Sequence, residues 1–410
     1  MRADTYKTQR VIFLAALLLL FVYRAFIFWQ HAFHGFAWDF AINRTAALGL
    51  LEGISLYDRA ALHQLAMTQT EMGARIFNGP FTSYIGLPTT AIFHIPFALL
   101  PFEVSVLVYR ICATLAMLGA VLLTGLALPQ EKRTVAWVAG LLCLSFWNAS
   151  RESVFLGQVD AWILLSLAAT IFLVSREKWV WAGATVSVAV LLKISPVWLL
   201  LYCVLQRQWH MLLAASGCIA LGLLLSLSSA HGRDLLHFVT AVLPVLSDSP
   251  LNPQNQSLGA ALARLFTEET NWRSFAVGIG AWKWMGVAVS AALLVVYWWR
   301  ERATQQYSVT ASGCAVAIFC ALFAGPLTWD HYLSWSIIAV MLLVACLFKK
   351  QWLILSITLL PLTSAVFYPT VEQITAYFAW RVWASVQIFS LLVVAVWLVA
   401  LPSVINNQKK

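Results

Sequence analysis

Apolar runs of about 18 or more residues recur along the whole chain, and they restrict its fold more than any other feature. Runs of that length can cross a bilayer as α-helices. The chain is 61% hydrophobic and 10% charged, whereas ordinary soluble domains are about 45–50% apolar and about 25% charged. The sequence therefore predicts an all-α, polytopic integral-membrane protein that forms a single domain over residues 1–410.

Short basic clusters separate the apolar runs, which explains the net charge of +9 without invoking nucleic acid. Placing these clusters in the cytoplasm makes the segments between them cross in pairs, and predicts roughly twelve transmembrane helices by the ~20-residue rule. The polar segments then gather on the outer side. They include a first loop at about 30–85 and a second long loop at about 230–275.

Two apolar stretches are too short for the crossings that this topology assigns to them. The run from Trp179 to Gln206 has to cross twice, so we expect two short helices that meet at KISP. The stretch GLPTTAIFHIPFALLP contains Pro88, Pro96 and Pro101, which predict a short interfacial or re-entrant element. No P-loop or GxGxxG precedes a helix, so a cytosolic nucleotide is not expected as the direct substrate.

The first outer loop begins with FAWDFAINRT, where Asp39 and Asn43 are four residues apart on one helical face. A carboxylate at a membrane surface can act as a general base once its pKa rises towards the working pH. Alternatively, Asp39 simply caps the first short helix. Tyr57 belongs to the YD pair that follows in the same loop, and Asn43 and Tyr57 are candidate contacts for a sugar or an acceptor.

Two further segments place polar residues at the predicted outer surface. In RESVFLGQVDAW, Gln158 and Asp160 could hydrogen-bond a sugar, although Arg151 could equally pair with Glu152 and Asp160 could cap a helix. In LLKISPVW, Lys193 lies within an apolar stretch, where an ionisable group is a functional-site candidate and an ammonium suits a lipid phosphate. The alternative is a snorkelling lysine.

The second long loop contains LNPQNQSLGAALARLF, in which Asn255 and Gln256 suit sugar hydroxyls and Arg264 could bind a phosphate. The alternative is an interfacial helix with Ser257 as its N-cap. A late segment, GPLTWDHYLSW, groups Trp329, Asp330, His331 and Tyr332 at an outer helix end. An Asp–His–aromatic cluster fits carbohydrate binding and proton handling, although aromatic residues also concentrate at membrane interfaces. No metal-ligand spacing occurs, so neither a metal nor a cofactor is expected.

In their order and spacing, these blocks resemble glycosyltransferase family 87, membrane enzymes of the C-type superfamily. The resemblance rests on D…ALGLLEGISLYD, GQVDAW, LLKISP with QRQW, NQSLGAALARL and GPLTWDHYLSW. It implies the C-type helical architecture with periplasmic loop helices, in a bacterial inner (plasma) membrane. It also implies a polyprenyl-phosphate sugar donor, typically carrying mannose, and a glycolipid or glycan acceptor. Asp39 would be the general base of an inverting displacement, and His331 would lie near the donor.

The sequence departs from the family pattern at two places. Tyr332 follows His331 where paired histidines are common, and SYIGLP replaces a tyrosine-proline-proline block. These departures bear on the sugar and the acceptor more than on the reaction class. Alternative functions are another C-type lipid-linked-sugar transferase or ligase, a secondary transporter, or a non-enzymatic flippase accessory. Transporters usually place ionisable residues near the bilayer midplane between repeats, whereas this chain concentrates them on one side and has no visible repeat.

Overall fold

The computed structural model describes residues 22–23, 26, 29–30, 32–69, 83–228, 232–248, 250–252, 254–266, 278–303, 308–347, 388–389, 391–396 and 398–399. Within these ranges the chain is helical, apart from the isolated bridges Pro250–Gly278 and Asn255–Trp329. The first expected transmembrane run lies largely outside the described residues. The last two expected runs, with the polar segment YPTVEQ between them, also lie largely outside.

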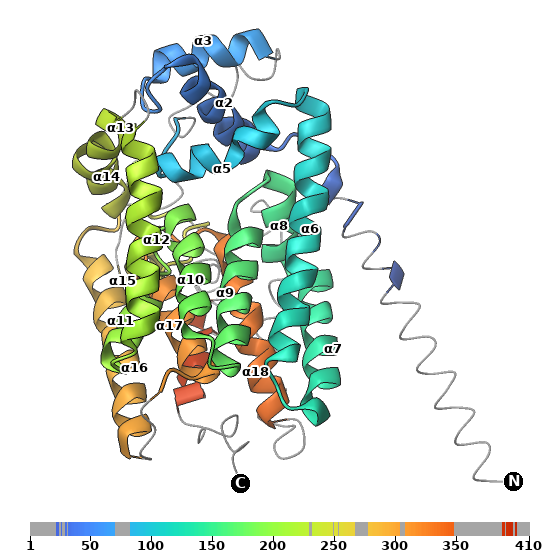
Figure 1. The fold of residues 1–410 in the computed structure, drawn as a ribbon, viewed down its shortest axis with the longest axis vertical. Helices are drawn as coiled ribbons and strands as arrows, with labels where there is room; N and C mark the ends of the chain where they lie inside the picture. Colours follow the sequence, from blue (N-terminus) through green and yellow to red (C-terminus); the bar gives the residue numbers. More distant parts are fainter. Residues whose placement is uncertain are drawn as a thin grey trace, which may run out of the picture.

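The helices fall into a layer of short loop helices above a bundle of longer ones (Figure 1). The loop layer contains α2 (Trp38–Glu52), α3 (Arg59–Gln69), α5 (Pro88–Ala98), α13 (Gly232–His237), the π-helical η1 (Phe238–Val242) and α14 (Leu243–Ser247). The bundle contains α6 (Phe102–Leu126), α7 (Gln130–Phe146), α9 (Asp160–Ser175), α10 (Trp179–Leu192), α11 (Val197–Leu205), α12 (Trp209–Ser228), α16 (Lys283–Ala303), α17 (Ala311–Ala324) and α18 (Ile337–Leu347). Shorter elements complete the described fold: α8 (Asn148–Leu156), α15 (Leu258–Phe266) and the 3₁₀ segments η2 (Gly280–Trp282) and η3 (Asp330–Ser336).

Three of the described helical segments are long and apolar enough to cross a membrane, namely Phe102–Leu126, Trp209–Leu227 and Gly280–Ala303. Four shorter apolar helical segments lie beside them: Asp160–Ser175, Trp179–Leu192, Ala311–Ala324 and Asp330–Cys346. The all-helical architecture is therefore confirmed for the described residues, whereas the expected number of roughly twelve spans is not.

Both predicted short elements are present. The run from Trp179 to Gln206 forms α10 and α11, which are separated at Lys193, a residue in extended conformation (φ −152°, ψ 138°). Pro196 immediately precedes α11, and its fixed φ suits that position. The proline-rich stretch forms α5, which begins at Pro88 and ends before Pro101, the N-cap residue of α6. Pro96 lies inside α5 and does not end it, whereas the other two prolines lie at helix boundaries.

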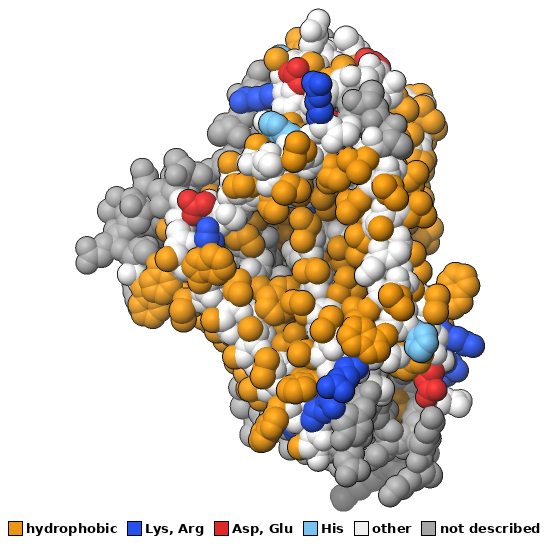
Figure 2. All heavy atoms as spheres, turned by 60° about the vertical axis from the view of Figure 1, so that its left-hand side comes forward, with side chains coloured by type: hydrophobic (Ala, Val, Ile, Leu, Met, Phe, Trp, Pro, Cys, Tyr) orange, Lys and Arg blue, Asp and Glu red, His pale blue; other side chains and the backbone are white. Residues whose placement is uncertain are grey.

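The bundle carries large apolar side chains on its outer surface as well as in its core. Figure 2 shows one face that is mostly hydrophobic, with Lys and Arg mainly above and below the apolar band. On α12 and α16 the exposed residues include Leu213, Leu221, Leu224, Val295 and Trp299. A soluble monomer rarely exposes so continuous an apolar surface, and a lipid environment accounts for it.

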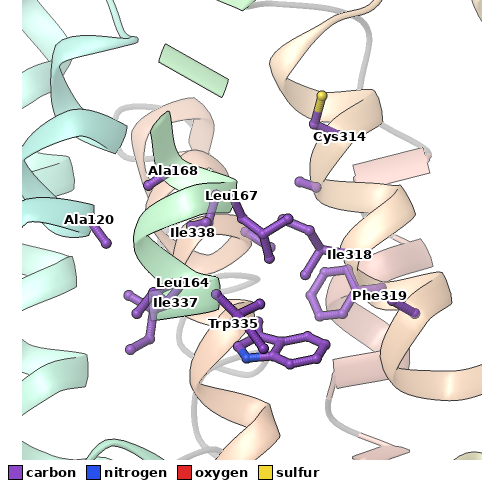
Figure 3. Close-up of a cluster of buried hydrophobic side chains, with 14 of the residues drawn as sticks. Ala120, Leu164, Leu167, Ala168, Cys314, Ile318, Phe319, Trp335, Ile337 and Ile338 are labelled. Carbon is purple, nitrogen blue, oxygen red and sulfur yellow. The ribbon is translucent and has the colours of Figure 1, made fainter. Parts of the chain in front are cut away.

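The core lies where α9 packs between α6 and α10, close to α17 and η3. Leu164 and Leu167 from α9 meet Ile318 and Phe319 from α17 around Trp335 (Figure 3). The α6–α7, α9–α10 and α11–α12 connections lie at the lower end of Figure 1, opposite α2, α3 and α5. Arg133, Arg176 and Arg207 therefore lie far from Asp39.

Candidate active site

A cavity of about 600 Å³ lies where the loop helices meet the ends of the bundle helices. A volume of this size is typical of small-molecule sites. The predicted site residues that line it are Asp39, Asn43, Gln158, Lys193, Trp329, Asp330 and His331. Residues far apart in the sequence thus share one cavity, with apolar side chains from α11, η1, α14 and α17 along the rest of its wall.

Asp39 is the second residue of α2, and its carboxylate faces this cavity. It does not cap the helix, because the N-cap is Ala37 and no side chain forms the cap hydrogen bond. Gln158 Nε2 instead donates a 2.7 Å hydrogen bond to Asp39 Oδ2. Burial raises the pKa of Asp39 from 3.8 to about 6, although the Gln158 hydrogen bond and the nearby charge of Lys193 oppose that rise.

Lys193 follows the last residue of α10, and its ammonium lies over the ring of Tyr332, 3.3 Å from the ring centroid. Lys193 Nζ donates to both carboxylate oxygens of Asp160, at 3.0 and 2.9 Å. This pairing differs from a snorkelling lysine, because both side chains are largely buried and hold each other. Asp160, which begins α9, lies behind Lys193 and does not line the cavity.

The segment from Trp329 to Tyr332 forms the start of η3 and one side of the cavity. His331 Nε2 lies 3.7 Å from Asp160 Oδ2, which is too long for a hydrogen bond. Asp330 is held by a hydrogen bond with Gln256. Tyr332, which follows His331 where the family pattern often has a second histidine, packs against Lys193.

The structure places the other predicted ligands behind the cavity wall, which argues against direct contact with a substrate. Tyr57 donates to the carbonyl of Gly86 at 2.8 Å. The amide of Asn255 donates to the carbonyls of Pro250 and Pro326 and accepts from the amides of Ser257 and Thr328. Every hydrogen-bonding atom of the Asn255 side chain is therefore engaged with backbone.

Arg264 is fully buried in α15, and its Nη1 donates to the carbonyls of Asn252 and Asn255. Neither Arg264 nor Gln256 lines the cavity. Ser257 caps α15, since its hydroxyl accepts from Ala260 N at 3.1 Å. The capped-helix interpretation thus accounts for this segment. Arg264 stabilises the loop that carries Asn255. Its predicted contact with a donor phosphate receives no support from these contacts and stays a prediction.

Glu152 pairs with Arg151 at 3.1 Å, as one interpretation of the sequence allowed, and Glu152 also lines the cavity. A second contact was not anticipated from the sequence. Thr90 Oγ1 donates to the carbonyl of Leu192 at 3.0 Å, so α5 supports the end of α10 from which Lys193 projects. An apolar sequence such as that of α5 gives no local signal of this long-range contact.

The described residues contain no group of three or more His, Cys, Asp or Glu side chains that could hold a metal ion. The site groups consist of a carboxylate with a raised pKa, a buried ammonium, an imidazole and amide side chains. All of them face one cavity in a helical protein with a lipid-compatible surface. These features define the class: a membrane protein with a cavity that collects titratable and amide side chains at the junction between loop helices and bundle helices.

Comparison with known sequences gives the family. Residues 84–326 match glycosyltransferase family 87, which is more than half of the chain, so the protein belongs to that family and is a glycosyltransferase. The chain is 26% identical over 318 residues to a polyprenol-phosphate-mannose-dependent alpha-(1-2)-phosphatidylinositol pentamannoside mannosyltransferase of Mycolicibacterium smegmatis. That match covers 72% of this chain and 71% of the relative.

A second relative is a polyprenol-phosphate-mannose-dependent alpha-(1-2)-phosphatidylinositol mannoside mannosyltransferase of Mycobacterium tuberculosis. It is 26% identical over 355 residues, which cover 82% of this chain and 77% of the relative. No solved structure matches the chain.

Proposed function

We propose that this protein transfers mannose from a polyprenyl-phosphate donor to a hydroxyl group of a glycolipid or glycan acceptor, at the outer face of the plasma membrane. The observation that carries the proposal is the single cavity shared by Asp39, Lys193 and His331. The donor class and the sugar are supported by the names of the mycobacterial relatives, which are polyprenol-phosphate-mannose-dependent enzymes.

The position of the cavity suits a donor with a lipid tail. Such a donor keeps its polyprenyl chain in the bilayer, so its phosphate and sugar reach only to the membrane boundary. The cavity lies at the junction of the loop layer with apolar helices, and its wall combines polar groups with apolar residues such as Trp198, Leu243 and Leu246. The polar groups of the wall would contact the phosphate and sugar of the donor, and the apolar residues would contact the first units of its polyprenyl chain.

Asp39 is the proposed general base. The acceptor oxygen attacks the anomeric carbon of mannose while its proton passes to the Asp39 carboxylate. The bond from that carbon to the phosphate oxygen breaks, and its electron pair leaves with polyprenyl phosphate. A base with a pKa of about 6 is largely ionised at neutral pH and still accepts a proton in the transition state. Direct displacement inverts the anomeric centre, so a β-linked donor gives an α-linked product.

Lys193 is the proposed ligand for the donor phosphate. An ammonium has three N–H donors, and Asp160 engages two of them. The third can face the cavity, where it would stabilise charge on the leaving phosphate. His331 lines the same wall and would lie beside the sugar or its phosphate. Asn43, Gln158, Trp329 and Asp330 are the proposed contacts for sugar and acceptor hydroxyls.

The periplasmic orientation of the site is supported by the distribution of basic residues. The α6–α7, α9–α10 and α11–α12 connections lie at the end of the bundle opposite α2 (Figure 1), and Arg133, Arg176 and Arg207 belong to these connections or to the helix turn beside them. Basic residues accumulate on the cytoplasmic side of membrane proteins. The loop layer with the cavity would then face the periplasm or the cell exterior.

A transfer assay with the purified full-length chain tests this function. The protein is reconstituted with radiolabelled polyprenyl-phosphate mannose and a panel of glycolipid acceptors that includes phosphatidylinositol mannosides. We expect label in a glycolipid and release of polyprenyl phosphate. Asp39→Asn should lower kcat by about 10²–10⁴-fold while leaving donor binding intact.

Asp58→Asn is the matched control, because Asp58 lies in the same loop outside the cavity and its carboxylate accepts from Ala61 N to cap α3. Asparagine caps equally well, so this variant should retain full activity. Full activity of Asp39→Asn would disprove the assigned base. Donor flux across proteoliposomes without any glycosyl transfer would instead favour a transporter.

A further inference from the structure

Arg110 is a buried cation in the N-terminal half of α6 that takes no direct part in the proposed chemistry. It is 3% exposed and does not line the cavity. A charged side chain within an apolar helix is costly, so its retention calls for a specific set of partners. Those partners are backbone carbonyls from two different segments of the chain.

The first segment leads into α2. Arg110 Nη1 donates to the carbonyl of Phe33 at 2.8 Å, and Nη2 donates to that of Gly35 at 3.1 Å. The second segment is the last turn of α8. There Nη2 donates to the carbonyl of Phe155 at 2.8 Å, and Nε donates to that of Val154 at 3.3 Å. One guanidinium therefore joins the start of α2 to the end of α8.

The same two segments position the hydrogen bond between Gln158 and Asp39, the proposed base. Asp39 lies in the first turn of α2, and Gln158 lies two residues beyond the end of α8. The residue before Arg110 acts on the same junction, because the Tyr109 hydroxyl donates to the carbonyl of Gln158 at 3.0 Å. Adjacent residues of α6 thus hold both the junction and the backbone of Gln158.

The junction also has little room for adjustment. Gly157 ends α8 with φ at 71°, and a Cβ at that position would lie 2.4 Å from Phe40 Cβ. The end of α8 therefore contacts α2 directly beside Asp39. A small displacement between the two segments would separate Gln158 Nε2 from Asp39 Oδ2.

We propose that Arg110 is a positioning residue that clamps α2 to the end of α8, and thereby keeps Gln158 hydrogen-bonded to Asp39. This inference rests on the proposed role of Asp39 as general base. Arginine is specifically suited to the position because its planar guanidinium presents donors in several fixed directions. Lysine has a single nitrogen, which cannot reach carbonyls on both sides with the same geometry.

The test compares Arg110→Lys and Arg110→Met with wild type in the transfer assay over a range of pH. Loss of the Gln158 hydrogen bond removes an interaction that lowers the pKa of Asp39. Losing a hydrogen bond to a charged group changes the free energy of ionisation enough to move the acidic limb of the kcat profile to higher pH by about one unit. We expect that shift, a fall in kcat on the order of 10²-fold from misplacement of the base, and little change in donor affinity.

Gln158→Leu provides the decisive comparison. Combined with Arg110→Met, it should move the acidic limb no further than Gln158→Leu alone, because both changes remove the same hydrogen bond. Arg133→Met is the matched control. Arg133 Nε donates to the carbonyl of Leu128 in the turn that precedes α7, far from the cavity, and this variant should keep the wild-type profile.

A wild-type acidic limb in both Arg110 variants would overturn the proposal, as would shifts that add in the double variant. If the Arg110 variants fail to fold, Tyr109→Phe decides, since it removes only the hydroxyl that holds Gln158. Tyr109→Phe should move the acidic limb of the kcat profile to higher pH. An acidic limb at the wild-type pH would refute the proposal that α6 keeps Gln158 hydrogen-bonded to Asp39. Should Asp39→Asn abolish transfer while Arg110→Lys behaves as wild type, only the positioning role fails and the proposed function stands.

Discussion

Replacing Asp39 by asparagine should lower kcat by about 10²–10⁴-fold and, at neutral pH, stabilise the protein. Burial raises the pKa of this carboxyl from 3.8 to about 6, against the Gln158 hydrogen bond and the nearby Lys193, which lower it. The folded state therefore holds the proton more tightly than the unfolded state does. As pH rises from about 4 to about 6, the folded protein must ionise a buried group, and its free energy of unfolding falls.

The difference between the two pKa values corresponds to about 3 kcal/mol, at 1.36 kcal/mol per unit. Asparagine has no proton to lose and can still accept the hydrogen bond from Gln158 Nε2. The variant should therefore match wild type below about pH 4 and become more stable by up to about 3 kcal/mol above pH 7. A stability gain at the expense of activity is the usual trade-off at an active site.

Thermal or denaturant unfolding of the purified protein in detergent, measured across pH 4 to 8, tests this expectation. Asp58→Asn is again the control, and it should follow the wild-type curve because asparagine replaces Asp58 equally well as the cap of α3. A variant Asp39→Asn that is less stable than wild type at pH 8 would refute the reasoning. So would a gain that is equally large at pH 4 and pH 8, since ionisation could not then be its cause.

Three further outcomes follow from the site. Lys193→Met should lower the free energy of unfolding by about 3–5 kcal/mol, because it leaves the buried carboxylate of Asp160 without its ion-pair partner. Adding Asp160→Asn should restore most of that stability without restoring donor affinity. A Lys193→Met variant that binds the donor as tightly as wild type would disprove the phosphate assignment. Gln158→Leu should move the acidic limb of the pH–rate profile above pH 6, because its hydrogen bond lowers the pKa of Asp39; a limb that stays in place would contradict that pairing. Arg264→Met should lower the unfolding midpoint yet weaken donor binding far less than Lys193→Met. An equal loss of donor affinity in the two variants would instead indicate that Arg264 binds the donor phosphate.

The sequence by itself determined the all-helical membrane class and the local breaks in the chain. Apolar runs long enough for a bilayer are a property of composition and length, so they can be recognised without knowing which helices touch. The length of the Trp179–Gln206 run, set against the two crossings that the topology requires, indicated the division between α10 and α11 near Lys193. Prolines, whose effect is equally local, indicated the separate short helix α5.

The family resemblance identified Asp39 and His331 as site residues, whereas Lys193 was singled out as an ionisable residue within an apolar stretch. All three line the cavity of the structure. The ordered blocks of sequence also indicated the enzyme class that the comparison with family 87 confirms. Spacing alone could not decide whether Asp39 caps a helix or acts as a general base, because either interpretation places an aspartate at the start of a helix.

Only the tertiary structure decided which polar groups face the cavity and which support it. Lys193 meets Asp160, Gln158 meets Asp39, and Arg110 meets two loop segments, each through contacts between residues distant in the chain. Asn255 and Arg264 have side chains suited to sugars and phosphates, but backbone carbonyls engage both. The physical reason is that a buried polar group must find a partner wherever packing places it, and neither composition nor spacing contains the information on which segments pack together.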